Sequence, residues 1–388
     1  MTERSLFPSA IISTATVDWN GDEQTAEDKK TADDPKLKKG ETPIYGDENG
    51  WLAVQLLDVT KGAEVEVEIA VDGIMKPSKW TGVITKAAPE VLIFPKAKWD
   101  YAALHTVRQQ RPVNATFKVT VDGEALEEQT EVCVLKSIND CPFAIVWDKE
   151  EGDVEDISAI FAAYVNENHP WVDELLKDAL QSKLVSSFSG YQSQNPEDVV
   201  TQVFAIWNIL QRRGIKYSDI STTTPDALVY SQTVRFVDDS IKGSQANCVD
   251  GSVLLASVLQ KIGIKSHLVI VPGHCFLAFE TVPIDWNQDF SLEELLKEGA
   301  LIPLETTLLG SDDLKPVTDL AKMPDKAKLK EFEASYTTFG NAISTGIDNM
   351  VEHLEALESG DEIMTNLISI ADARELGIMP LASTMDKK

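Results

Sequence analysis

The stretch SQANCVDGSVLLASVLQKIGIKSHLVIVPGHCFLAFE, residues 244–280, decides the fold of the C-terminal part of the chain. Its first polar residues lead into an apolar segment with helical periodicity, Cys248–Ile262, and Gly263 follows as a C-cap. Two apolar runs come next, Ser266–Val271 and Cys275–Glu280, with a Pro-Gly turn between them. The stretch therefore predicts a helix followed by two neighbouring strands, which is an α+β arrangement.

Helical and strand patterns continue on both sides of this stretch. The spacing of Val199, Val203 and Trp207 places them on one apolar helix face, so Trp207 is predicted to belong to the core. Further helices are predicted over Asp156–Val165, Trp171–Leu184 and Pro196–Arg213 and through most of the chain from Pro324, and further strands over Leu301–Glu305 and Ile363–Ile370.

The first 140 residues are predicted to form β-structure. Runs with alternating apolar residues are separated by Asp-Gly turns, which indicates a sandwich of immunoglobulin-like type. These runs are Trp51–Val59, Glu64–Val71, Ala115–Val121 and Glu131–Leu135. Residues 20–49 contain almost no large apolar side chain, so we expect a mobile acidic loop there.

Length and charge limit the classes of protein that fit. A chain of 388 residues is too long for one ordinary core. We therefore expect a β-sandwich domain over residues 1–140, an α+β domain over 141–320 and a mostly helical extension over 321–388. The net charge of −28 argues against partners with a phosphate backbone and against anionic membrane surfaces.

The cysteines and the N-terminal sequence indicate in which cellular compartment we expect the protein. No apolar run approaches the roughly 20 residues of a membrane helix, and the N-terminal apolar stretch is short and interrupted by Pro8 and Ser9. The four cysteines form no CxxC pair, so neither a zinc knuckle nor a disulfide scaffold is indicated. We expect reduced thiols and a cytoplasmic location.

Cys248 lies where the polar loop meets the apolar helix, with Asn247 placed as the N-cap. A thiol in the first turn of a helix faces unsatisfied N–H groups and the positive end of the helix dipole, and both favour the thiolate. The alternative is that Cys248 is a small core residue. Cys275 is a second candidate nucleophile, but it would lie within a strand, away from a helix terminus.

A thiolate nucleophile needs an imidazole within hydrogen-bond reach, and His274 follows the Pro-Gly turn at the start of a strand next to the helix. An acceptor on the other ring nitrogen orients such a base. Glu305 ends the apolar run LIPLE and is our choice for this acid. The competing carboxylates are Asp250, Asp285 and Asp289.

The order of these residues resembles that of the transglutaminase-like superfamily of papain-type enzymes. The motifs that carry the resemblance are ANCVDGSVLLASVLQKIGI, PGHCFLAFE and LIPLETT, and they cover roughly residues 200–310. The resemblance implies that Cys248 is the nucleophile, His274 the base and Glu305 the orienting acid. The sequence differs in having Glu where the family usually has Asp, and Phe276 where Trp is common. Arylamine N-acetyltransferases and peptide N-glycanases have the same order, but the arginine–glycine context of the former is absent around Cys248.

An acyl-thiol reaction also needs an oxyanion hole. The N–H of Cys248 is one expected donor, and Gln232 is preferred over Gln245 as the second, although either glutamine would equally fit a structural role. Trp207 and Tyr230 could line the pocket. No GxGxxG, Walker A, HExxH or GxSxG motif occurs, so no nucleotide cofactor is implied. The acidic pairs Asp238-Asp239 and Asp312-Asp313 lack metal-site spacing and are predicted to be solvated.

The sequence thus predicts cysteine-dependent acyl transfer from a peptide or amide carbonyl through a thioester. Release to water would make the chain a peptidase or amidase, which is the preferred interpretation. Release to an amine would make it a cross-linking transglutaminase. The alternative from another class is a binding or assembly protein that keeps the fold without the chemistry.

Overall fold

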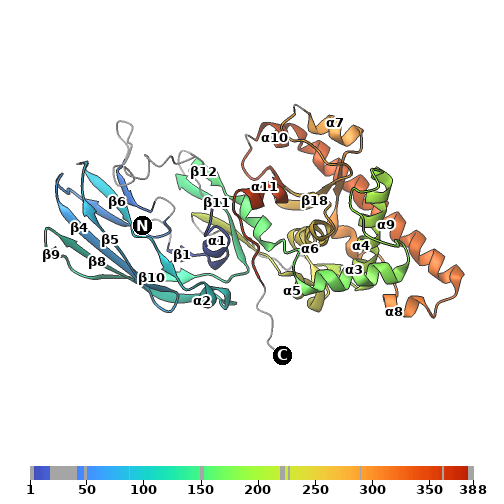
Figure 1. The fold of residues 1–388 in the computed structure, drawn as a ribbon, viewed down its shortest axis with the longest axis horizontal. Helices are drawn as coiled ribbons and strands as arrows, with labels where there is room; N and C mark the ends of the chain where they lie inside the picture. The colour runs from blue at the N-terminus through green and yellow to red at the C-terminus, as the bar shows by residue number, and fades with distance from the viewer. Residues whose placement is uncertain are drawn as a thin grey trace. The chain divides into compact units, whose positions relative to one another are not determined.

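The computed structural model describes residues 4–17, 42–47, 50–86, 88–148, 153–218, 223–225, 228–288, 290–360 and 362–382. About 37% of the chain is helical and 28% lies in strands, so the predicted α+β class is correct. The chain divides into two compact units, Met1–Ile138 and Asn139–Lys388 (Figure 1).

The first unit contains two sheets, and alternation along the strands explains its core. One sheet has the order β1-β10-β8-β4-β5-β7, with β9 beside β8, and the other has the order β2-β6-β3. On β4, Val65, Val67 and Ile69 are buried while the intervening glutamates lie on the outer face. The strands are β1 Ser5–Leu6, β2 Ile44–Gly46, β3 Val54–Leu57, β4 Glu64–Val71, β5 Met75–Val83, β6 Glu90–Phe94, β7 Lys98–Trp99, β8 Arg111–Val121, β9 Glu124–Ala125 and β10 Gln129–Leu135, and the helices are α1 Pro8–Ser13 and α2 Tyr101–His105.

Two features of the first unit differ from the sequence predictions. Most of the predicted 20–49 loop lies outside the described residues, but its end is ordered. Ile44–Gly46 forms β2, which pairs with β6, because the Tyr45 ring reaches the core and is 1% exposed. A short helix, Pro8–Ser13, was not predicted, since all of its residues are buried and no polar face marks it in the sequence.

The second unit contains the sequence stretch from which the prediction began. Its main sheet has the order β19-β18-β17-β20, and two other sheets have the orders β12-β11-β15-β14 and β13-β16. The strands are β11 Asp140–Asp148, β12 Asp153–Asp156, β13 Lys216–Tyr217, β14 Thr223–Pro225, β15 Val229–Thr233, β16 Gln245–Ala246, β17 Ser266–Val271, β18 His274–Glu280, β19 Leu301–Leu304 and β20 Asn366–Ser369. The helices are α3 Pro170–Ser182, α4 Pro196–Arg212, α5 Val237–Gly243, α6 Cys248–Lys261, α7 Leu292–Lys297, α8 Val317–Leu320, α9 Asp325–Glu352, α10 Leu354–Ser359 and α11 Ile370–Glu375, with 3₁₀ helices η2 Ser158–Tyr164 and η3 Thr306–Gly310.

Helix α6 is central in the second unit and is buried along nearly its whole length. A capping box fixes where it begins. The Asn247 side chain accepts from the N–H of Asp250 at 2.7 Å, and the Asp250 side chain accepts from the N–H of Asn247 at 3.0 Å. Cys248 is consequently the first residue of the helix, as the sequence predicts.

The predicted helix over Asp156–Val165 was wrong. Asp156 ends strand β12, and Ser158–Tyr164 forms the 3₁₀ helix η2. The run SAIFAAY is almost wholly buried, so it has no polar face to give a helix period, and its entry is fixed by the N–H of Ile157 bonding to the carbonyl of Phe143 at 3.0 Å.

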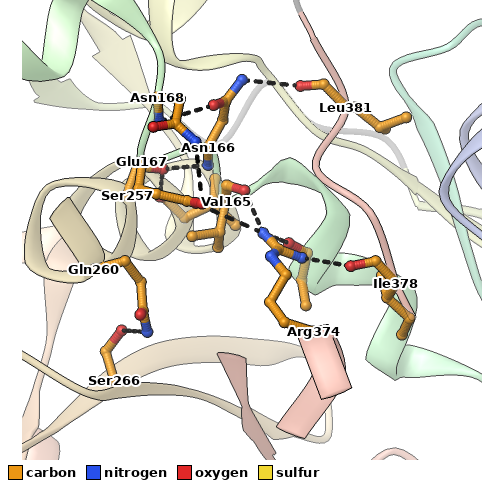
Figure 2. Close-up of polar contacts among 12 residues, drawn as sticks. Val165, Asn166, Glu167, Asn168, Ser257, Gln260, Ser266, Arg374, Ile378 and Leu381 are labelled. Atoms are coloured by element: carbon orange, nitrogen blue, oxygen red, sulfur yellow. Dashed lines mark hydrogen bonds and ion pairs between the residues drawn. The ribbon is translucent and has the colours of Figure 1, made fainter. Parts of the chain in front are cut away.

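The C-terminal segment belongs to the second unit and is held to it by polar contacts. Strand β20 pairs with β17 as an edge of the main sheet. Figure 2 shows Arg374 donating to the carbonyl of Val165 at 2.6 Å and of Ile378 at 2.9 Å. Asn166 donates to the carbonyl of Leu381 at 3.2 Å, and its N–H bonds to Ser257 of α6 at 2.9 Å. The turn at 165–168 therefore ties α6 to the residues that follow β20.

Candidate active site

Cys248 differs from the three other cysteines in its burial. Cys133, Cys141 and Cys275 are buried, and burial raises the pKa of each of these thiols. Cys248 is partly exposed at the N-terminus of α6, where the first N–H groups of a helix lack intrahelical acceptors. Cys248 is therefore the cysteine that we expect reagents to reach.

His274 begins β18, directly after the turn formed by Pro272 and Gly273. Gly273 has φ +74°, a left-handed conformation that glycine adopts without strain. The imidazole stacks on Phe276 with ring centroids 6.0 Å apart, and its side chain is 29% exposed. The turn and the stacking set the direction of the ring.

Glu305 follows β19 and is 2% exposed. Its Oε1 accepts from the N–H of Thr307 at 3.0 Å and from the Thr307 hydroxyl at 2.7 Å. Its Oε2 lies 2.7 Å from Nε2 of His274 and accepts from Nδ2 of Asn349 at 3.0 Å. Burial acts to raise the pKa of the Glu305 carboxyl, but the hydrogen bonds from His274 and Thr307 outweigh it and lower this pKa.

Both predicted partners of His274 act on its ring. Glu305 is ionised and can only accept, so Nε2 of His274 is the donor in the bond between them. Hydrogen bonding to Cys248, then to Glu305, together with their charges, raises the pKa of His274 to about 10 against the opposing effect of burial. The arrangement favours the imidazolium form of His274.

Small residues allow helix α6 to lie directly against the residues that follow Glu305. A Cβ at Gly251 would be 2.9 Å from the Thr306 hydroxyl. That hydroxyl donates to the carbonyl of Cys248 at 3.3 Å, and the Ser252 hydroxyl donates to the same carbonyl at 2.8 Å. The first turn of α6 is thus joined to the residue next to Glu305.

Asp250, one of the competing acids, has a structural role. It is fully buried, and besides capping α6 it accepts from Nη1 of Arg235 at 2.6 Å and from the N–H of Arg235 at 2.7 Å. Asp285 lies in an exposed loop and bonds to Asn287 and Gln288. Asp289 lies outside the described residues.

The predicted oxyanion and pocket residues lie on several elements. Gln232 is on β15 opposite Cys141, and within the described residues no hydrogen bond joins its side chain to Cys248, His274 or Glu305. Gln245 is exposed on β16. Tyr230 stacks with Phe143, with centroids 6.3 Å apart. Trp207 is fully buried, which confirms its predicted place in the core.

Sequence reasoning missed Asn349, Thr306 and Arg235, which complete the surroundings of the three residues. Thr306 and Thr307 could have been identified from the sequence, because their two hydroxyls directly follow a lone acid at the end of an apolar strand. Asn349 had no such signal, since it lies in a polar region of a long helix far along the chain from Glu305. Arg235 also had none, because its pairing with Asp250 depends on the tertiary fold.

The acidic pairs make protein contacts. Asp238 is 8% exposed, so its predicted solvation was wrong, and it lies 3.6 Å from His169 and 3.1 Å from Lys242. Asp312 accepts from Thr338, while Asp313 is solvated and pairs with Lys216 at 2.6 Å. Within the described residues no group of three or more His, Cys, Asp or Glu side chains is placed to hold a metal ion.

A second histidine–carboxylate pair lies at the other end of β18. His267 Nε2 is 3.0 Å from Glu280, whose carboxylate also accepts from Trp286 and from the N–H of Ile284, both at 2.9 Å. His267 and Glu280 are both buried and no cysteine takes part in these contacts. This pair therefore anchors the loop after β18.

A cavity of about 420 Å³ lies between α3, α4, α5 and α8 and is lined by none of the three predicted catalytic residues. Its three cations are each paired with an acid: Arg212 with Glu331, Arg213 with Asp178, and Lys242 with Asp238. Its charges are thus balanced by the protein itself.

Within the part of the chain that the structure describes, no helix has the length and apolarity to cross a bilayer. No protein-family model matches the chain, and no curated protein matches it either. The residues of the site are therefore the basis for the function proposed below.

Proposed function

We propose that this chain is a cysteine-dependent acyl-transfer enzyme that acts on a peptide or amide carbonyl. The observation that supports the proposal is that the His274 imidazole is hydrogen-bonded to the buried Glu305 carboxylate at 2.7 Å, while a partly exposed Cys248 also raises the pKa of this imidazole. This is the arrangement that activates a thiol. On this proposal the second unit contains a transglutaminase-like, papain-type domain, and the two sheets of the first unit form a sandwich.

Acylation would use the ion pair between the thiolate and the imidazolium. The Cys248 sulfur attacks the carbonyl carbon and forms a C–S bond. As the C–N bond breaks, the proton on His274 passes to the departing amine. The N–H of Cys248 at the start of α6 is one donor to the developing oxyanion, and the second donor, predicted as Gln232, remains a prediction.

Deacylation would use His274 in its neutral form as a base. The imidazole takes a proton from water, the water oxygen attacks the thioester carbonyl, and the C–S bond breaks to return the thiolate and the imidazolium. An amine in place of water would give a new amide. We prefer hydrolysis, because transfer to an amine also requires a channel that excludes water.

The test combines thiol labelling with turnover. At neutral pH, iodoacetamide is expected to modify Cys248 at least about tenfold faster than Cys133, Cys141 or Cys275, because the last three are buried with raised pKa values. Peptide mapping identifies the modified residue. Incubation with a peptide library should then yield cleaved products, with an acyl adduct on Cys248 visible by mass spectrometry.

Three controls make the result interpretable. Cys248→Ala should abolish turnover, whereas Cys133→Ala, which changes a buried cysteine of the first unit, should not. Added methylamine distinguishes the acceptors, since a methylamide product indicates transfer and a free acid indicates hydrolysis. Slow, uniform labelling of all four cysteines without turnover would reject the enzyme and favour a binding protein that lacks the chemistry.

A further inference from the structure

Helix α9 contacts Glu305 at two points that lie two helical turns apart. The N–H of Glu305 donates to the carbonyl of Ala342 at 3.0 Å. Seven residues later on the same helix, Nδ2 of Asn349 donates to Oε2 of Glu305 at 3.0 Å. Positions 342, 346 and 349 share one face of the helix, so a single face holds both the backbone and the side chain of the acid.

Gly346 allows this contact to be so close. A Cβ at position 346 would lie 2.8 Å from the carbonyl carbon of Pro303 and 2.9 Å from the nitrogen of Leu304. Both are backbone atoms of β19, which cannot move aside as a flexible side chain would. The absence of a side chain at 346 thus sets the distance between the helix and the strand that ends at Glu305.

The four donors to Glu305 divide between its two oxygens. Thr307 supplies both donors to Oε1, while His274 and Asn349 supply the donors to Oε2. The Thr307 contacts are local, because this residue follows the acid by two positions. Asn349 is the donor that fixes Oε2 independently of the histidine that Oε2 must orient.

We propose that Asn349 is a positioning residue: with Gly346 beside it, it holds Oε2 of Glu305 against the His274 ring, so that helix α9 is part of the catalytic apparatus. The involvement of α9 in catalysis rests on the proposed function. The way in which Asn349 holds Glu305 does not depend on turnover. Hydrogen bonds that an ionised carboxylate accepts are stronger than neutral ones, so losing one of the four is expected to be measurable.

The experiment follows the titration of His274 in the full chain by the NMR signal of its ring. His274→Gln identifies the signal by removing it. In the wild-type chain the midpoint is expected at about 10. Asn349→Leu replaces the donor with an apolar side chain of similar size, so Oε2 of Glu305 is free to turn away from the ring. The midpoint of the His274 titration should then fall by roughly one pH unit. Asp348→Leu, on the exposed side of the same helical turn, is the matched control and should leave the midpoint in place.

A role of Asn349 in anchoring α9 alone would give a different result. The melting temperature would fall, but His274 would titrate as in the wild-type chain, and that outcome overturns the proposal. If Asn349→Leu does not fold, Asn349→Ala removes the same donor without added bulk and is measured in the same way.

The proposed function and the positioning role of Asn349 can be rejected independently of each other. An unreactive Cys248 in the wild-type chain would reject the enzyme but would leave the titration experiment valid. Conversely, with a peptide substrate in hand, Asn349→Leu should slow acylation about tenfold, because a Glu305 carboxylate that is free to turn leaves the imidazole misaligned for proton transfer. An active enzyme whose rate and His274 titration are both unaffected by Asn349→Leu would reject only the positioning role.

Discussion

At the scale of the residue, Cys248 and the buried Glu305 carboxylate together favour the protonated form of the His274 imidazole. Glu305 is ionised because four donors surround it, and its charge favours the imidazolium form of His274. Cys248 also raises the pKa of His274. A histidine held in this way keeps its proton at neutral pH, as the proposed protonation of a leaving amine requires.

Glu305→Gln tests this dependence through both titration and stability. The neutral amide keeps the size of the side chain but loses the charge, so the pKa of His274 should fall from about 10 toward 6.5. In the wild-type chain the raised pKa contributes stability that is complete below pH 6.5 and is lost as the pH rises through about 10. The free energy of unfolding, measured in urea, should therefore decline more steeply between these pH values in the wild-type chain than in Glu305→Gln. Equal slopes would contradict the prediction.

The three predicted catalytic residues could be found from the sequence because each has a local signal. Cys248 follows an N-cap residue, His274 follows a Pro-Gly turn, and Glu305 ends a short apolar run. Asn349 could not be found in this way. Its place depends on the distance between α9 and β19, which is fixed by packing and leaves no pattern around residue 349.

At the scale of the element, α9 combines two glycines in opposite surroundings. Gly346 faces the backbone of β19, where a Cβ would come within 2.8 Å of it. Gly340 lies on the exposed side, and a Cβ there would meet no atom within 4 Å in the described structure. The same substitution at these two positions separates packing from helix propensity.

Gly346→Ala and Gly340→Ala are expected to change stability in opposite directions. Gly346→Ala forces α9 and β19 apart and should lower the free energy of unfolding by about 1–3 kcal/mol, the usual cost of overpacking. Gly340→Ala should raise it by about 0.5–1 kcal/mol, because alanine loses less conformational freedom than glycine in a helix. Urea unfolding followed by circular dichroism gives both values. If Gly340→Ala instead lowered the free energy of unfolding, the prediction would be contradicted, and the side of α9 at position 340 would be in contact with other residues.

Elements with a clear start or end signal, or with a regular apolar pattern, were predicted well, whereas two short buried helical segments were not. The amphipathic helix α4 and the capped helix α6 begin and end close to the predicted residues. The segments Pro8–Ser13 and Ser158–Tyr164 are almost wholly buried, and neither was predicted with its observed conformation. Apolar and polar residues alternate with a regular period because one side of an element faces water. This periodicity is absent where every side of the element is buried.

At the scale of the whole molecule, the hydrogen bonds and charges that act on His274 and Glu305 come from residues of the second unit. Cys248, Thr307 and Asn349 all lie within Asn139–Lys388, as do the strands of the main sheet. The predicted third region, 321–388, supplies Asn349 and the edge strand β20 to that unit. The last part of the chain is therefore needed for the sheet that carries His274.

Residues 139–388 alone are expected to fold and to keep the reactive thiol. The segment forms its own compact unit with its own core, so it should unfold in one cooperative thermal transition. Iodoacetamide should modify Cys248 at the rate found in the full chain, while Cys141 and Cys275 stay protected. Labelling of all three cysteines at similar rates would show that the unit needs residues 1–138 to fold.

The order in which the ribosome makes these parts has a consequence for the nascent chain. The cysteine is synthesised first, then the histidine and the glutamate, and the helix and the edge strand that hold them in place emerge later. A chain that has been translated only as far as Thr307 carries the three reactive groups without the support of Asn349 or β20. On the proposed function, the thiol would be fully activated only after these supporting segments have been synthesised.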